Sequence, residues 1–167
     1  MARPASAQSS DNSTFFPMLR YTNCLLYETG VKMALLTWSD KFSVGIPSVD
    51  DQHIVLFESL NDLHAAMMKG NAQSLTKTLL RNLVAYTRDH FKSEEAMMSA
   101  AHYPGFLAHR TKHIELTRQV EDYAARFERG EIMLSVHLLN FLRDWLTTHI
   151  QVEDHAYGPW MREHGGR

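Results

Sequence analysis

Four stretches of the chain carry apolar residues at intervals of three and four, the spacing that places side chains along one face of an α-helix. Pro47 and Ser48 mark the start of the first stretch, and Gly70 and Gly130 mark the ends of the first and third. No alternating pattern typical of a β-strand competes with them. The pattern therefore predicts four helices, over residues 48–68, 72–100, 104–128 and 132–154.

Short connections decide how these helices are arranged. A link of a few residues forces neighbours to run antiparallel, so we expect an all-α protein with an up-down-up-down antiparallel four-helix bundle. The bundle would occupy residues 37–167, and Gly158 with Pro159 would stop whatever follows the fourth helix. Residues 1–36 include a small, polar, aperiodic run, so we expect a flexible, disordered extension or a tag, in which Cys24 is incidental.

Composition and charge narrow the class of protein. Lys and Arg number 17 and Asp and Glu number 19, and the formal net charge of -2 argues against nucleic-acid binding. A single cysteine excludes a disulfide within the chain and a cysteine-based zinc or iron–sulfur site. No run approaches the ~20 apolar residues of a membrane span. We therefore expect a cytoplasmic protein, and a monomer.

The chain contains 10 histidines, and half of them fall on stripes that the predicted helices turn toward the core. A buried imidazole without a partner costs ~1–3 kcal/mol, so a whole group in one interior needs a common reason. The others lie near loops, helix ends or outer faces, although His64 also fits an inward stripe. The inward group is His53, His90, His109, His113 and His149, and the outer group is His64, His102, His137, His155 and His164.

Two pairs of metal-ligating residues are spaced four apart, His90 with Glu94 and His109 with His113. At ~100° per residue, such partners lie only ~40° apart around the helix. With one histidine from each remaining helix they converge on the bundle axis, where di-metal sites are commonly built.

A second carboxylate follows His149, and two residues compete for the position. Helical geometry favours Glu153, which is four residues on. Asp154 lies ~140° from His149 on a straight helix. It could join the cluster only where the helix loosens or ends, for example in a π-type turn, whose period suits a spacing of five.

Four short motifs in this order resemble the hemerythrin family, and its single-domain bacterial members most closely. They are DDQH ending at His53, HFKSEE from His90, HRTKH from His109, and HIQVED from His149 to Asp154. The resemblance extends from about Trp38 to Trp160. It implies two iron ions (Fe2+/Fe3+) with an oxo or hydroxo bridge. One iron would take His109, His113 and His149, the other His53 and His90, with Glu94 and Asp154 bridging; Asp154 then replaces Glu153.

The implied donor set bears on function. Three histidines on one iron and two on the other leave a position open for a small ligand. Di-iron oxygenases and ferritin-like proteins use more carboxylates and Glu-x-x-His motifs, and this chain has no such motif. We therefore expect reversible O2 binding, for storage or for delivery to an O2-consuming enzyme, and no enzymatic activity.

Groups around the irons can also be assigned from their positions. An apolar pocket should exclude water, and its expected walls are Leu56, Trp145 and Leu146, one turn from His53 or His149. Other side chains should orient the imidazoles by accepting their remaining N–H. The candidates are Gln52, Asp51, Glu95 and Tyr157.

Three other functions stay open at this point. A sensor of O2, nitric oxide or redox state would need an output module, which residues 1–36 are too short and polar to supply. A di-iron redox enzyme would need turnover faster than autoxidation. A structural zinc bundle would have no reason for seven ligands divided between two metals.

Overall fold

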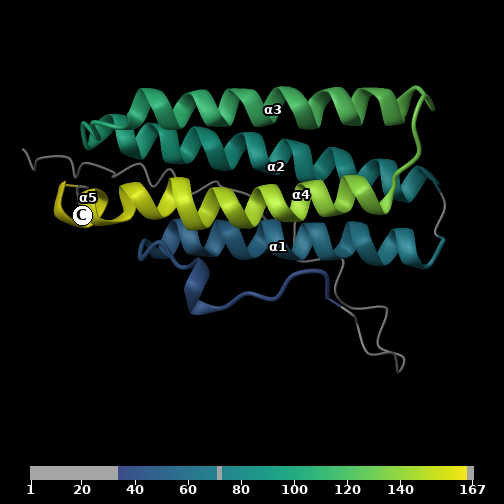
Figure 1. Cartoon of the computed structure of the whole chain (residues 1–167), viewed down its shortest axis with the longest axis horizontal. Coiled ribbons are helices and arrows are strands. Elements are labelled where there is room, and N and C mark those ends of the chain that lie inside the picture. The colour runs from purple at the N-terminus through teal and green to yellow at the C-terminus, as the bar shows by residue number, and fades with distance from the viewer. Residues whose placement is uncertain (1–33, 71–72, 165–167) are drawn as a thin grey trace, which may run out of the picture. The chain divides into compact units, whose positions relative to one another are not determined.

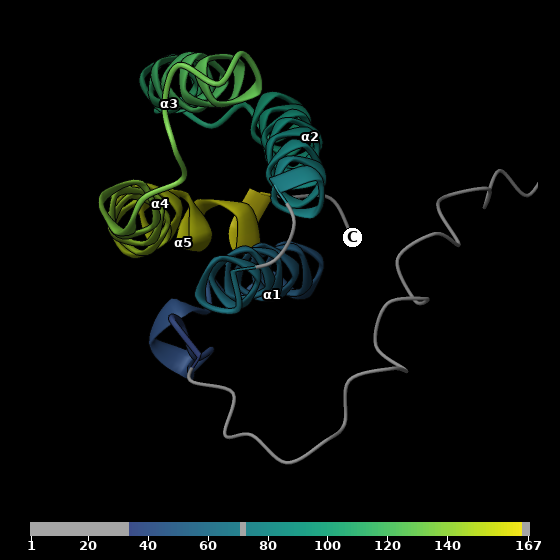
Figure 2. The same cartoon turned by 90° about the vertical axis from the view of Figure 1, so that its right-hand side faces the viewer.

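The computed structural model describes residues 34–70 and 73–164. Four long helices in this part are α1 (Pro47–Met68), α2 (Gln73–Ala100), α3 (Phe106–Glu128) and α4 (Val136–Thr148). Their connections lie at alternating ends, so successive helices run antiparallel (Figure 1). Seen end-on, the four helices stand at the corners of a square (Figure 2). The predicted all-α up-down-up-down bundle is confirmed.

The helix ends follow local chemistry. Pro47 takes the first position of α1, where its missing N–H costs nothing. Gly70 and Gly130 follow α1 and α3 with φ of 60° and 75°, the left-handed conformation that glycine adopts without strain. The last long helix begins at Val136, four residues later than the pattern predicts, because Ser135 caps it by accepting from the Leu138 N–H at 3.3 Å.

The apolar stripes form one core along the bundle, with members such as Leu60, Leu80, Leu116 and Leu142. Leu75 falls on the apolar spacing of α2 but is 44% exposed, because the first turn of α2 lies at the end of the bundle. No helix in the described ranges is long and apolar enough to cross a membrane.

The fourth helix does not stop where the sequence predicts. After α4, a π-helical segment η2 (His149–Asp154) leads directly into α5 (His155–His164), and Pro159 lies inside α5. The proline removes one helical hydrogen bond. Burial of Tyr157 and Met161 against a second small core offsets that loss, and Gly158 lets the helix approach the backbone at Val44 closely. The expected stop at Gly158–Pro159 is therefore wrong.

The residues before α1 form a strap along the bundle, which we define as Ala34–Gly45; it contains the short helix η1 (Asp40–Phe42). Leu36 exchanges two hydrogen bonds with Asn61 of α1, at 2.9 and 2.8 Å, and Trp38 packs on Phe57. Residues 34–36 of the expected extension lie in the described part of the chain, and Leu35 and Leu36 pack against the core. The rest of that prediction, with Cys24, lies outside the described residues.

Replacing Asn61 by Ala should loosen this strap. The substitution leaves a partly buried N–H and C=O of Leu36 without partners, which costs about 1–2 kcal/mol. Chemical denaturation should show the loss in the free energy of unfolding. Glu58→Ala, an exposed change one turn away on α1, is the matched control and should leave stability within about 0.5 kcal/mol. Equal stability of the two variants would contradict the account of the strap.

Candidate metal centre

All seven residues expected around the metals lie together inside the bundle. Each is at most 4% exposed. They come from α1, α2 and α3 and from η2, the segment that joins α4 to α5. The set is His53 from α1, His90 and Glu94 from α2, His109 and His113 from α3, and His149 and Asp154 from η2.

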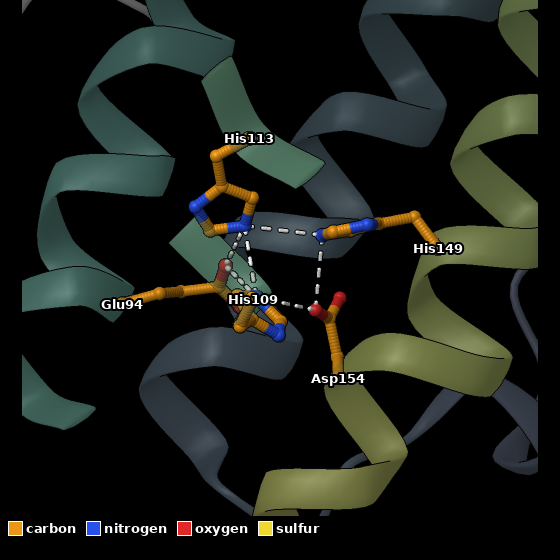
Figure 3. Close-up of side chains that lie close together, drawn as sticks. All are labelled: Glu94, His109, His113, His149 and Asp154. Carbon is orange, nitrogen blue, oxygen red and sulfur yellow. Dashed lines mark hydrogen bonds and ion pairs between the residues drawn. The ribbon is translucent and has the colours of Figure 1, made fainter. Parts of the chain in front are cut away.

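Three imidazoles form the first half of the cluster, together with both carboxylates (Figure 3). The Nε2 atom of His113 lies 2.9 Å from Nε2 of His109 and 3.1 Å from Nε2 of His149. Asp154 Oδ1 lies 3.1 Å from His149 Nε2, and Glu94 Oε2 lies 3.3 Å from His113 Nε2. All five ligand atoms fall within 4.8 Å of one another, so this group could hold one metal ion.

Two further imidazoles form the second half. His53 Nε2 lies 3.2 Å from Asp154 Oδ2, and His90 Nε2 lies 3.6 Å from Glu94 Oε2. The ligand atoms of these four residues also fall within 4.8 Å of one another. Both carboxylates belong to both halves, so the cluster has the form of two adjacent metal positions that share Glu94 and Asp154.

The π-helix explains why Asp154 takes part. A π-helical turn has a longer period than an α-turn, so a residue five positions after His149 returns to the same face. Asp154 is fully buried in the cluster, whereas Glu153 is only half-buried and belongs to neither group. The choice of Glu153 from ideal helical geometry is wrong.

Unpartnered atoms test whether these residues fit a pair of metal ions. Among buried side chains in the described ranges, His53 Nε2, Glu94 Oε2 and both Asp154 carboxylate oxygens have no hydrogen-bond partner. Buried polar atoms rarely lack a hydrogen-bond partner in folded proteins, because each such atom costs ~1–3 kcal/mol of stability. Imidazole and carboxylate are suitable ligands for iron. The residues therefore fit a di-iron centre.

The electrostatics of the cluster also suit a metal. Burial lowers the pKa of His90 to about 4, so its ring is neutral near pH 7. Burial alone would raise the pKa of Glu94, but the neighbouring imidazoles of His90, His109 and His113 hold it well below its usual value. A neutral imidazole and an ionised carboxylate are the forms that bind metals.

Comparison with known proteins decides the family. The model of the hemerythrin HHE cation-binding domain matches residues 44–161. The chain belongs to the hemerythrin family. It is 38% identical over 130 residues to bacteriohemerythrin of Methylococcus capsulatus, covering 77% of this chain and 98% of the relative. It is 31% identical to myohemerythrin-1 of Phascolopsis gouldii over 72% of this chain and 89% of that protein.

Solved structures agree with this placement. A crystal structure of wild-type hemerythrin superposes with a TM-score of 0.74 at 36% identity, covering 77% of this chain and 98% of the other. The matching family model is described as a cation-binding domain. The buried cluster of histidine, glutamate and aspartate described above could bind such a cation in this chain.

Side chains around the cluster orient its members. Gln52 Oε1 lies 2.8 Å from His90 Nδ1, and Glu95 Oε1 lies 3.1 Å from His113 Nδ1, so each can accept the remaining ring N–H. Asp51 is exposed and has no such contact. Tyr157 accepts from no imidazole; its hydroxyl donates to Glu94 Oε1. Of the four expected acceptors, two are confirmed, Asp51 is wrong, and Tyr157 acts on a carboxylate instead.

Tyr157→Phe should remove the hydrogen bond that orients the Glu94 carboxylate. Burial raises the pKa of Tyr157 far above its usual value, so the hydroxyl stays protonated and donates at any physiological pH. Losing this buried bond to a carboxylate should cost about 1.5–3 kcal/mol of stability in the metal-free protein and speed iron loss to a chelator. Tyr103→Phe, a half-buried tyrosine beside it, is the control. Equal iron loss from both variants would refute the role of Tyr157.

An apolar cavity of about 30 Å³ lies in the bundle about one helical turn from the cluster, and Leu56, Trp145 and Leu146 all line it. Other lining residues also lie three positions from a histidine of the cluster, as Leu116 does from His113. The only polar side chain in its wall is Thr87, whose hydroxyl donates to the Leu83 carbonyl at 2.8 Å. The three residues expected to form the pocket thus line the same apolar cavity.

Aromatic rings pack directly on the imidazoles. Trp145 stacks on His149 with ring centroids 4.7 Å apart, and Phe91 stacks on His113 at 3.8 Å. Sequence reasoning missed Phe91, although its position directly after His90 was a usable signal. None of the five outer histidines is buried, and His64, the ambiguous one, is half-buried.

Proposed function

We propose that this chain binds O2 reversibly at a di-iron centre, and that it stores O2 or delivers it to an O2-consuming enzyme. One iron would be held by His109, His113 and His149, the other by His53 and His90, with Glu94 and Asp154 bridging. The observation that carries the proposal is the pair of overlapping ligand groups that share both carboxylates.

The donor count supports binding of O2 over its activation. A bound pair of iron ions would supply the electrons for reversible O2 binding by changing between Fe2+ and Fe3+. The chain offers three imidazoles to one position and two to the other, so the second position is where a small ligand is expected. Five neutral imidazoles against two carboxylates keep the site less anionic than the carboxylate-rich sites of ferritin-like proteins.

The residues around the centre would protect it from water. The cavity beside the cluster is lined almost wholly by hydrocarbon and has room for about one water-sized molecule. A small apolar space stays dry, whereas O2 is itself apolar and partitions into it. We therefore propose that Leu56, Trp145 and Leu146 form the O2 pocket. The expectations of a monomer and of a cytoplasmic location stay predictions from the sequence.

Iron analysis tests the centre directly. Protein loaded anaerobically with Fe2+ and freed of excess metal should contain about two irons per chain, as expected for a di-iron bundle. The same sample should take up O2 in a ratio of one molecule to two irons and release it under vacuum. A stoichiometry of one metal per chain, or a preference for zinc with no O2 uptake, would overturn the proposal.

A further inference from the structure

A second hollow lies outside the metal centre, between the strap and α5. It has a volume of about 390 Å³. The strap contributes Asp40 and Ser43–Gly45, and α5 contributes His155, Pro159 and Arg162, which share one helix face at spacings of four and three. None of these residues belongs to the two ligand groups of the metal centre. We call this hollow the α5 groove.

Hydrogen bonds fix both walls of the α5 groove. On the strap, the Asp50 carboxylate accepts from the Ser43 hydroxyl at 2.6 Å and from the Val44 N–H at 2.8 Å. The Val44 carbonyl in turn accepts from Arg162 Nη1 at 2.9 Å, which ties the strap to α5. A Cβ at Gly158 would lie 2.7 Å from that carbonyl, so the walls approach as closely as glycine allows. A groove held in this way loses little entropy when a ligand binds.

Two side chains of opposite charge line the α5 groove without forming an ion pair with each other. Arg162 carries a positive charge and donates one N–H to the Val44 carbonyl. Asp40 carries a negative charge, and within the described ranges its carboxylate has no hydrogen bond and no ion pair, with Arg162 or with any other residue. His155, a half-buried residue, also lines the groove, but its Nε2 atom is covered by protein and has no hydrogen-bond partner.

We propose that the α5 groove binds a small zwitterion of amino-acid size. The ligand's carboxylate would accept from the free N–H groups of Arg162, and its ammonium would donate to Asp40. An anion alone would face Asp40 and a cation alone would face Arg162, so the pairing of charges selects a molecule that carries both. The volume lies at the lower end of the range for small-molecule sites.

Such a ligand would bridge the strap and α5, and thus act on the fold next to the metal centre. Asp154 directly precedes His155, and Tyr157 of the same helix donates to Glu94. A molecule that binds the native arrangement and not the opened one stabilises it by mass action. Its binding should therefore raise the melting temperature of the protein. This effect can be measured without measuring O2 binding.

The test uses ligands matched in length on the iron-loaded full chain. Isothermal titration calorimetry would compare 4-aminobutyrate with butyrate, which lacks the ammonium, and with butylamine, which lacks the carboxylate; glycine covers a shorter separation of charges. One of the two zwitterions should bind at least about tenfold more tightly than either single-charge compound, and should raise the melting temperature. No heat from either zwitterion, or butyrate bound as tightly, would overturn the proposal.

Variants then assign the contacts. Asp40→Asn removes a charge that holds no contact in the fold, so it should fold normally and weaken zwitterion binding about tenfold while sparing butyrate. Arg162→Gln should weaken both zwitterion and butyrate, and its melting temperature without ligand shows how much of the effect is structural. Glu163→Gln, an exposed neighbour outside the α5 groove, is the control. Unchanged zwitterion affinity in Asp40→Asn would refute the assignment.

Discussion

His109→Ala should abolish the di-iron centre. The Nε2 atom of His109 lies 2.9 Å from that of His113 and 3.4 Å from Asp154 Oδ1, so its loss opens one of the two proposed metal positions. Substituting a group that merely orients a ligand typically costs 10–100-fold in metal affinity, so loss of a ligand should cost more than about 100-fold. Iron analysis should find about one iron per chain or less, compared with about two in the parent.

A matched variant separates this effect from a general disturbance. His137→Ala removes an exposed histidine from the start of α4, twelve residues before His149, and should leave the iron content unchanged. Far-ultraviolet circular dichroism of both variants should confirm that the helices persist. Retention of two irons by His109→Ala would remove His109 from the centre and contradict the proposed ligand set.

Leu146→Ala should keep iron but speed its autoxidation severalfold. Leu146 is buried, lines the apolar cavity and stands one turn before His149. Truncating its side chain enlarges a space that now has room for about one water, so water and anions can approach the irons. The variant should also lose about 2–5 kcal/mol of stability, as core leucines do on truncation. The measurement is the rate at which the oxygenated protein converts to its ferric form in air.

Leu139→Ala provides the control for lost stability. Leu139 is equally buried on α4 but does not line the cavity, so truncating it should cost comparable stability and leave autoxidation unchanged. If Leu139→Ala autoxidises as fast as Leu146→Ala, destabilisation and not the pocket sets the rate. If neither variant differs from the parent, Leu146 does not guard the centre.

The sequence was most informative where regular helix geometry holds. Periodicity located the four helices, and four-residue spacings placed His90 with Glu94 and His109 with His113 on shared faces. Burying several imidazoles in one interior is costly unless they share partners, so the placement of five histidines on inward stripes indicated metal binding. The same regularity placed Leu56, Trp145 and Leu146 around one cavity, because each lies one turn from a ligand candidate.

The sequence was least informative where the helix departs from the ideal. An α-helical repeat selects Glu153, and only the π-helix of η2 brings Asp154 to the cluster. Pro159 and Gly158 are ordinary stop signals, yet burial of Tyr157 and Met161 carries α5 through them. Contacts such as Leu36 with Asn61, 25 residues apart, depend on tertiary packing that local patterns do not encode. The family resemblance, and not spacing, identified Asp154.

The most direct test of reversible O2 binding at a di-iron centre is a visible absorption spectrum taken through one complete cycle. The anaerobically reduced, iron-loaded protein should be nearly colourless, gain a visible charge-transfer band on exposure to O2, lose it under vacuum, and regain it on a second exposure. A rapid and irreversible shift to the ferric spectrum on first contact with O2 would contradict this account.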